Sequence, residues 1–197
     1  PGGVAYGRIV MAGVGKGLNE QDQLALGGRL YAHLNQMGVK AAQVALEATG
    51  RDLPEAAANV AHGAHLRSYR FDKYRTQEKA DAKPTLRTLA IRVKGAAAAR
   101  RAYAPLEKVA DGVFFTRDLV SAPPNVLYPE TFAKEVKALT KLGVKVEILG
   151  EKQMAKLGMG SLLGVGQVSV RESQIAIMRW DGAAKSQQPV AFIGKGV

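Results

Sequence analysis

A lysine between two glycines stands at the end of the sequence, as Gly194-Lys195-Gly196, after an apolar run over 189–193. The run predicts a buried strand, and the small neighbours leave space around the lysine side chain. Ligands and catalytic groups of open α/β sheets collect at the carboxyl ends of strands. We therefore expect Lys195 to lie at a sheet edge, as part of a functional site.

A second Gly-Lys-Gly, at 15–17, follows another predicted strand over 8–14. It invites comparison with a phosphate-binding loop, in which four residues separate the first glycine from the Gly-Lys pair and Ser or Thr follows the lysine. Here Val10 stands where that first glycine is needed, and Gly17 follows Lys16. A tight turn after a strand is therefore preferred to a nucleotide site.

Other reactive side chains are scarce. The chain has no cysteine, which excludes disulfides, thiolate metal ligands and a cysteine nucleophile. Its three histidines are His33, His62 and His65. His62 and His65 are three residues apart and could share a helix face, but no third ligand lies nearby in the sequence. Surface histidines are therefore preferred to a metal-binding pair.

The formal net charge of +11 is concentrated between residues 67 and 108. Twelve basic residues in this stretch stand against four acidic ones. The basic residues are Arg67, Arg70, Lys73, Arg75, Lys79, Lys83, Arg87, Arg92, Lys94, Arg100, Arg101 and Lys108. A solvated surface whose acidic partners lie elsewhere is the preferred interpretation. The alternative is nucleic-acid binding, which a steep salt dependence of binding to duplex DNA would indicate.

Strand and helix patterns alternate along the chain, which predicts an α/β fold with a mostly parallel sheet. Asn19 is placed to cap a helix that Gly38 ends. The expected strands are 8–14, 41–46, 86–93, 144–148, 173–180 and 189–193, and the expected helices are 19–38, 52–67, 104–122, 129–139 and 151–157. The polar and aromatic stretch 68–84 is expected to be an ordered loop. The organisation that follows is a domain over 1–103, a linking helix over 104–122 and a second domain from 123 to 197.

Apolar residues make up 47% of the sequence, which is enough for a packed core. No apolar stretch approaches the length of a membrane span, and the first residues do not resemble a signal peptide. The sequence begins with Pro1 rather than Met, so we expect the native start to be missing.

Four segments, taken together and in order, resemble the leucyl aminopeptidase (cytosol aminopeptidase) family. They are Tyr69–Tyr74, Thr116–Asn125, Leu157–Gln167 and Phe192–Val197. Two small departures are Ser121, where the family commonly has Asn, and Val168, where it usually has Gly. The resemblance implies an internal piece of a longer enzyme, truncated at both ends. It would comprise a partial amino-terminal α/β domain, the linking helix and the start of the catalytic peptidase domain.

The resemblance also implies a chemistry. Members of the family remove amino-terminal residues from peptides with two divalent metal ions, manganese or zinc. Lys195 matches the lysine metal ligand of the family, which must bind as the neutral amine. The remaining ligands and the catalytic residues are expected beyond Val197, so this chain alone is expected to be inactive. The intact protein would be a cytoplasmic homohexamer acting on peptide substrates without membrane association, and some members of the family also bind DNA.

Overall fold

The computed structural model describes residues 7–15, 17–47 and 53–197. The chain separates into two compact units, Pro1–Arg117 (unit 1) and Asp118–Val197 (unit 2). Both contain helices and strands, so the predicted α/β class is confirmed. Within the described ranges, no helix combines the length and apolar character needed to cross a bilayer.

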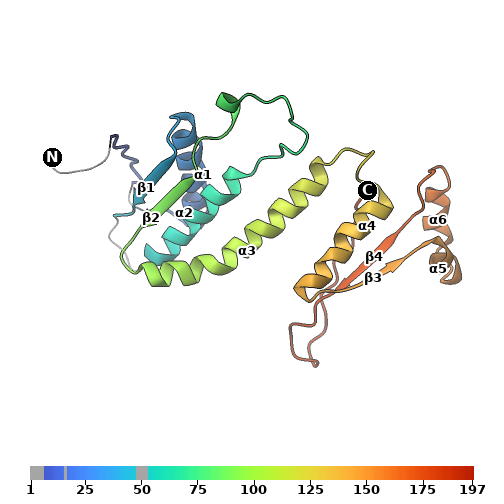
Figure 1. Cartoon of the computed structure of the whole chain (residues 1–197). Helices are drawn as coiled ribbons and strands as arrows, with labels where there is room; N and C mark the ends of the chain where they lie inside the picture. Colours follow the sequence, from blue (N-terminus) through green and yellow to red (C-terminus); the bar gives the residue numbers. More distant parts are fainter. Residues whose placement is uncertain (1–6, 16, 48–52) are drawn as a thin grey trace. The chain divides into compact units, whose positions relative to one another are not determined.

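Unit 1 is built from two helix–strand repeats followed by a long helix (Figure 1). Its elements are α1 (Glu20–Gln36), β1 (Ala41–Ala45), α2 (Leu53–Ser68), the 3-10 turn η1 (Ala80–Ala82), β2 (Thr88–Arg92) and α3 (Ala96–Ser121), whose last turn belongs to unit 2. β1 and β2 pair in parallel, with Ala41 opposite Thr88 and Ala45 opposite Arg92. The predicted parallel pairing is therefore confirmed.

The ends of α1 are set by local interactions that the sequence predicted. The Asp22 backbone N–H donates to Asn19 Oδ1 at 2.9 Å, which satisfies one of the free donors of the first turn. Gly38 follows the C-cap residue Met37 with φ of 71°, a conformation that costs glycine little.

Glycines allow α1 and α2 to pack closely against each other. A Cβ atom on Gly27 would collide with the carbonyl oxygen of Val60, and one on Gly63 would collide with that of Leu24. The residues buried around this contact are small or aliphatic, and they include Leu26, Ala57, Ala58, Val60 and Ala64. The backbones of the two helices therefore pack directly on each other, with little side-chain material between them.

The linking helix is longer than predicted. α3 begins at Ala96 rather than near 104, and Pro105 lies inside it. Its first turn is an alanine run with high helix propensity, and the Gly95 carbonyl accepts the Ala98 and Ala99 N–H groups. Pro105 removes one backbone hydrogen bond without ending the helix.

Unit 2 consists of short elements around a two-stranded sheet (Figure 1). They are α4 (Pro129–Ala138), the 3-10 turn η2 (Leu139–Leu142), β3 (Lys145–Leu149), α5 (Glu151–Lys156), α6 (Gly160–Gly166) and β4 (Ile175–Arg179). β3 and β4 are antiparallel, with Lys145 opposite Arg179. The predicted positions of α4, β3, α5 and β4 are confirmed. Gly143, with φ of 89°, ends η2, and α6 was not predicted.

Two predicted strands are not formed. Residues 8–14 and 189–193 form no regular secondary structure, and most of their side chains are exposed. Phe192 and Ile193 are 94% and 98% exposed. A strand needs a neighbour to satisfy its backbone N–H and C=O groups, and in the described part of the chain neither segment pairs with one. The prediction that Lys195 follows a buried strand is therefore wrong for this structure.

The glycine contact between α1 and α2 can be tested with a matched pair of substitutions. Gly63→Ala is expected to lower the free energy of unfolding by about 1–3 kcal/mol, because its methyl group would overlap the Leu24 carbonyl. Gly28→Ala is the control: its Cβ would meet the Gly63 oxygen at 3.7 Å, an ordinary contact, and alanine favours the helix. Urea unfolding of both variants measures the difference. Equal destabilisation would contradict the packing described here.

Candidate functional site

Lys195 lies in an exposed segment at the end of unit 2. The next residue, Gly196, contacts the aromatic ring of Phe132 on α4, and a Cβ at this position would overlap the ring. The lysine is thus one residue away from a contact with the folded part of the unit. Its own side chain faces solvent.

The described residues do not by themselves form the two-metal site that the family resemblance implies. Across 7–15, 17–47 and 53–197, no group of three or more His, Asp or Glu side chains is arranged to hold a metal ion. A single lysine nitrogen cannot satisfy the coordination of a divalent cation. The donors in this chain therefore do not fit two metals without further ligands.

Of the two neighbouring histidines of α2, His62 is buried and His65 is half-buried, so the prediction of a surface position is wrong for His62. His62 is only 7% exposed, and its Nδ1 has no hydrogen-bond partner among the described residues. Burial, and secondarily the nearby His65, lower the pKa of His62 below its ordinary value. His65 Nδ1 lies 2.9 Å from the Tyr103 hydroxyl on α3. This burial was not predicted from the sequence, because the neighbours of His62 in α2 are mostly alanine and glycine, whose own burial leaves no strong apolar pattern.

Aromatic and cationic contacts attach α3 to α2 and to the residues after it. The His65 ring meets Phe114 edge-on at 5.0 Å, and Phe114 contacts Tyr69 at 5.2 Å between ring centroids. The Arg117 guanidinium lies 5.3 Å from the Tyr69 ring centroid and donates to the Leu66 carbonyl at 3.0 Å. These contacts use residues of the loop at 69–74, which the sequence predicted to be ordered.

The rest of that loop is also structured. Arg70 forms an ion pair with Glu78 and donates to the Ala82 carbonyl at 3.4 Å, while the Phe71 and Tyr74 rings lie 5.7 Å apart. The prediction of an ordered loop over 68–84 is confirmed.

The basic stretch is only partly neutralised within the described residues. Arg70 and Arg75 approach Glu78, and Lys108 pairs with Asp111 at 2.9 Å. A second group of cations is exposed on both sides of β2 and in the first turns of α3, and no described acidic residue pairs with it. This group is Arg87, Arg92, Lys94, Arg100 and Arg101. Nucleic-acid binding by the basic stretch stays a prediction.

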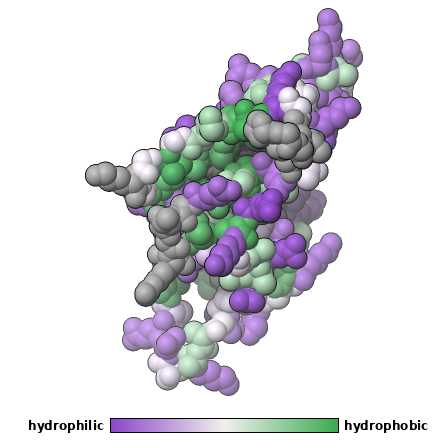
Figure 2. Space-filling view, turned by 90° about the vertical axis from the view of Figure 1, so that its left-hand side faces the viewer, coloured by the Kyte–Doolittle hydropathy of each residue, from purple (hydrophilic) through white to green (hydrophobic). Residues whose placement is uncertain are grey.

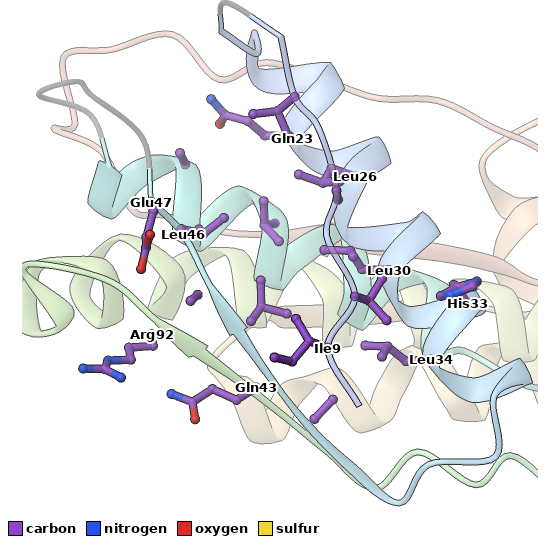
Figure 3. Close-up of a pocket in the computed structure, with 18 of the residues that line it drawn as sticks. Ile9, Gln23, Leu26, Leu30, His33, Leu34, Gln43, Leu46, Glu47 and Arg92 are labelled. Atoms are coloured by element: carbon purple, nitrogen blue, oxygen red, sulfur yellow. The ribbon is translucent and has the colours of Figure 1, made fainter. Parts of the chain in front are cut away.

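An apolar cavity of about 1340 Å³ opens in unit 1 between residues of 7–15, Gly17, Leu18, α1, α2 and β1. Its walls carry Leu26, Leu30, Leu34, Val44 and Val60, and its rim includes Gln23, His33, Glu47 and Arg92 (Figure 3). Figure 2, which views the molecule from the left-hand side of Figure 1, shows apolar surface on that face. The cavity has few polar groups that converge on one point, so it does not resemble a catalytic centre.

Comparison with known families assigns both ends of the chain. Residues 1–78 match the N-terminal domain of the cytosol aminopeptidase family, and residues 114–197 match its catalytic domain. The chain belongs to the cytosol aminopeptidase family. Lys195 falls within the range that matches the catalytic domain.

Relatives support the same assignment over the full sequence. A probable cytosol aminopeptidase from Caulobacter vibrioides is 50% identical over 200 residues, and one from a Bradyrhizobium species is 48% identical. Each match covers 100% of this chain and 40% of the relative. The chain thus spans less than half the length of these curated relatives.

Solved structures agree with the fold. A tomato leucine aminopeptidase variant is similar with a TM-score of 0.67 and 27% identity, covering 77% of this chain and 31% of that protein. The bottromycin maturation enzyme BotP is similar with a TM-score of 0.68 over 83% of this chain and 34% of its own. At 22% identity, the second likeness concerns the fold alone.

Burial of His62 predicts acid sensitivity of unit 1. The pKa of folded His62 is lowered, so below about pH 6.5 the unfolded chain binds a proton more readily than the folded one. The free energy of unfolding therefore has its full value above that pH. It decreases as the pH falls towards the lower pKa of the folded state. His62→Leu should flatten this dependence between pH 7.5 and about pH 5, as measured by urea unfolding.

The control is His33→Leu at an exposed position of α1. Its pH dependence should follow that of the unsubstituted chain. If His62→Leu retains the full acid sensitivity, the burial of His62 is not its cause.

Proposed function

We propose that this chain is part of a metal-dependent aminopeptidase that hydrolyses amino-terminal residues from peptides with two divalent metal ions, manganese or zinc. The observation that carries the proposal is the ordered match of 1–78 and 114–197 to the two domains of one aminopeptidase family. A structure of the fold neighbour BotP is in complex with Mn, which favours manganese as the first metal to test.

Lys195 is proposed as one metal ligand of the longer protein. Its motif and its place in the range that matches the catalytic domain support this role. An amine ligates only when neutral, and a neighbouring dication in a desolvated pocket would favour that form. Because the described residues supply no further cluster of ligands, the remaining donors would come from other parts of the longer protein.

The organisation of the longer protein is part of the same proposal. We place an amino-terminal domain over 1–103, a linking helix over 104–122 and the start of the catalytic domain over 123–197. In the structure α3 begins at Ala96, so the linking helix starts within the range given to the first domain. A homohexamer in the cytoplasm acting on peptides is proposed from the family, and DNA binding by the basic stretch stays a prediction from charge alone.

The 197-residue chain by itself is expected to have no peptidase activity. One exposed lysine without an accompanying set of acidic ligands cannot hold two dications. Hydrolysis of a leucyl chromogenic substrate would be measured with added manganese, on material whose intact mass is verified. Metal-dependent turnover by this material would refute the assignment of the remaining ligands to other parts of the protein.

In the longer protein, Lys195→Ala is expected to reduce metal content and to lower peptidase activity by orders of magnitude, because it removes a nitrogen ligand. Lys195→Arg should fail as well, since guanidinium does not lose its proton to become a ligand. Both variants should fold and assemble normally, because the side chain is not part of the packed core. Bound metal per subunit and leucyl-substrate turnover would be measured together.

Lys16→Ala is the matched control, because Lys16 stands in the other Gly-Lys-Gly. It should keep nearly full metal content and rate. Full metal and full activity in Lys195→Ala, or loss of both in Lys16→Ala, would show that the site was assigned to the wrong lysine.

A further inference from the structure

Two aspartates in the sequence are followed directly by glycine: Asp111 precedes Gly112, and Asp181 precedes Gly182. An Asp–Gly pair can rearrange without an enzyme, because glycine has no side chain to keep its nitrogen from the carboxyl carbon of the aspartate. The reaction needs a main chain that is free to turn and a glycine N–H that is free of hydrogen bonds. The folded structure therefore decides which of the two pairs can react.

The side chains of the two aspartates have closely matched surroundings. The Asp111 carboxylate lies 2.9 Å from Lys108 Nζ. The Asp181 carboxylate lies 2.6 Å from Lys145 Nζ. The two aspartate side chains are 55% and 54% exposed, respectively. Neither exposure nor ion pairing therefore distinguishes the two Asp–Gly pairs.

The main chain does distinguish them. Gly112 lies inside α3, where each backbone N–H donates to the carbonyl four residues earlier and ψ is held at its helical value. Gly182 follows β4 and lies outside any helix or strand, and its N–H donates to no backbone carbonyl among the described residues. The Gly182 nitrogen can therefore approach the Asp181 carboxyl carbon, whereas the same movement at Gly112 would break the helix.

From this difference we propose that Asp181 is a covalent modification site, where isoaspartate forms through a cyclic imide, and that the ion pair with Lys145 slows this reaction. The Gly182 nitrogen bonds to Asp181 Cγ and loses its proton, and one carboxyl oxygen leaves as water. A second water then attacks the Asp181 main-chain carbonyl, and the bond from that carbon to nitrogen breaks. The main chain now runs through Cγ, and the total mass is unchanged.

The ion pair with Lys145 acts on the form of the carboxyl group that reacts. The imide forms from the neutral acid, because a carboxylate has no oxygen that can leave as water. The hydrogen bond from Lys145, together with the charges of Lys145 and Arg179, lowers the pKa of Asp181 below its ordinary value. At neutral pH the reactive form is therefore scarcer than it would be without the lysine.

Isoaspartate would change the end of the β3–β4 sheet. Lys145 is the first residue of β3, and its partner in the register, Arg179, is the last residue of β4. The Lys145–Asp181 ion pair thus joins the start of one strand to the residues after the other. Isoaspartate adds one carbon to the main chain and moves the carboxylate, so we expect the ion pair to be lost. The inference concerns unit 2 alone and does not depend on the peptidase proposal.

Peptide mapping of the chain after several weeks at neutral pH tests the proposal. Trypsin releases Asp181 in the peptide 180–185 and Asp111 in the peptide 109–117, and each peptide holds one Asp–Gly pair. Chromatography with electron-transfer fragmentation measures isoaspartate in each. We expect at least about tenfold more at Asp181 than at Asp111, because an amide inside a helix is rarely free. Equal amounts, or none at Asp181, would overturn the inference.

The same incubation in guanidinium chloride is the control for the folded main chain. Both pairs should then form isoaspartate at similar rates, because α3 no longer holds Gly112. A preference for Asp181 that persists in the unfolded chain would show that the folded main chain is not its cause, and would overturn the inference.

A second pair of variants tests the ion pair. Lys145→Ala is expected to speed isoaspartate formation at Asp181 about two- to fivefold, as the loss of an exposed ion pair allows, without changing the rate at Asp111. Lys141→Ala is the control, because Lys141 is exposed and belongs to none of the ion pairs of the described residues. An unchanged rate in Lys145→Ala, or an equal increase in Lys141→Ala, would overturn the role given to Lys145.

Discussion

The direct backbone contact of α1 with α2 organises unit 1. Gly27 and Gly63 have no side chain, so the backbones of the two helices contact each other directly at these points. This contact holds α2 in the position from which His65 reaches Tyr103 and Arg117 reaches the Leu66 carbonyl. The long helix α3 therefore contacts the rest of unit 1 by way of α2. The burial of His62 on α2 results from the same packing. Larger residues at either glycine would separate the helices and loosen every later contact.

Strand pairing is the second constraint, and it acts in both units. β1–β2 and β3–β4 each satisfy one edge of their strands, and the other edges have no partner strand within the described residues. A two-stranded sheet has little stability of its own, so helix packing must supply most of the stabilisation. In unit 1, α1 and α2 do this. In unit 2, Ala133 and Val136 of α4 are buried together with Leu149 of β3.

Family membership and local geometry bear on different parts of the functional question. The match to two domains of one aminopeptidase family identifies the chemistry to be tested, whereas the structure shows Lys195 in solvent, one residue from the Phe132 contact. A metal ligand needs converging donors and a desolvated setting, and neither is a property of a single residue. The lysine is thus a candidate whose role depends on groups outside its own segment.

The sequence by itself determined the features that depend on residues close together in the chain. The sequence predicted the Asn19 cap, the glycine ends at Gly38 and Gly143, the positions of the four paired strands and of most helices, and the motifs of the aminopeptidase family. Tertiary structure alone decided the burial of His62, the contact of Gly27 with α2, and the unpaired state of 8–14 and 189–193. The physical reason is that caps and turns close within a few residues, whereas burial and strand pairing require groups far apart in the chain to meet.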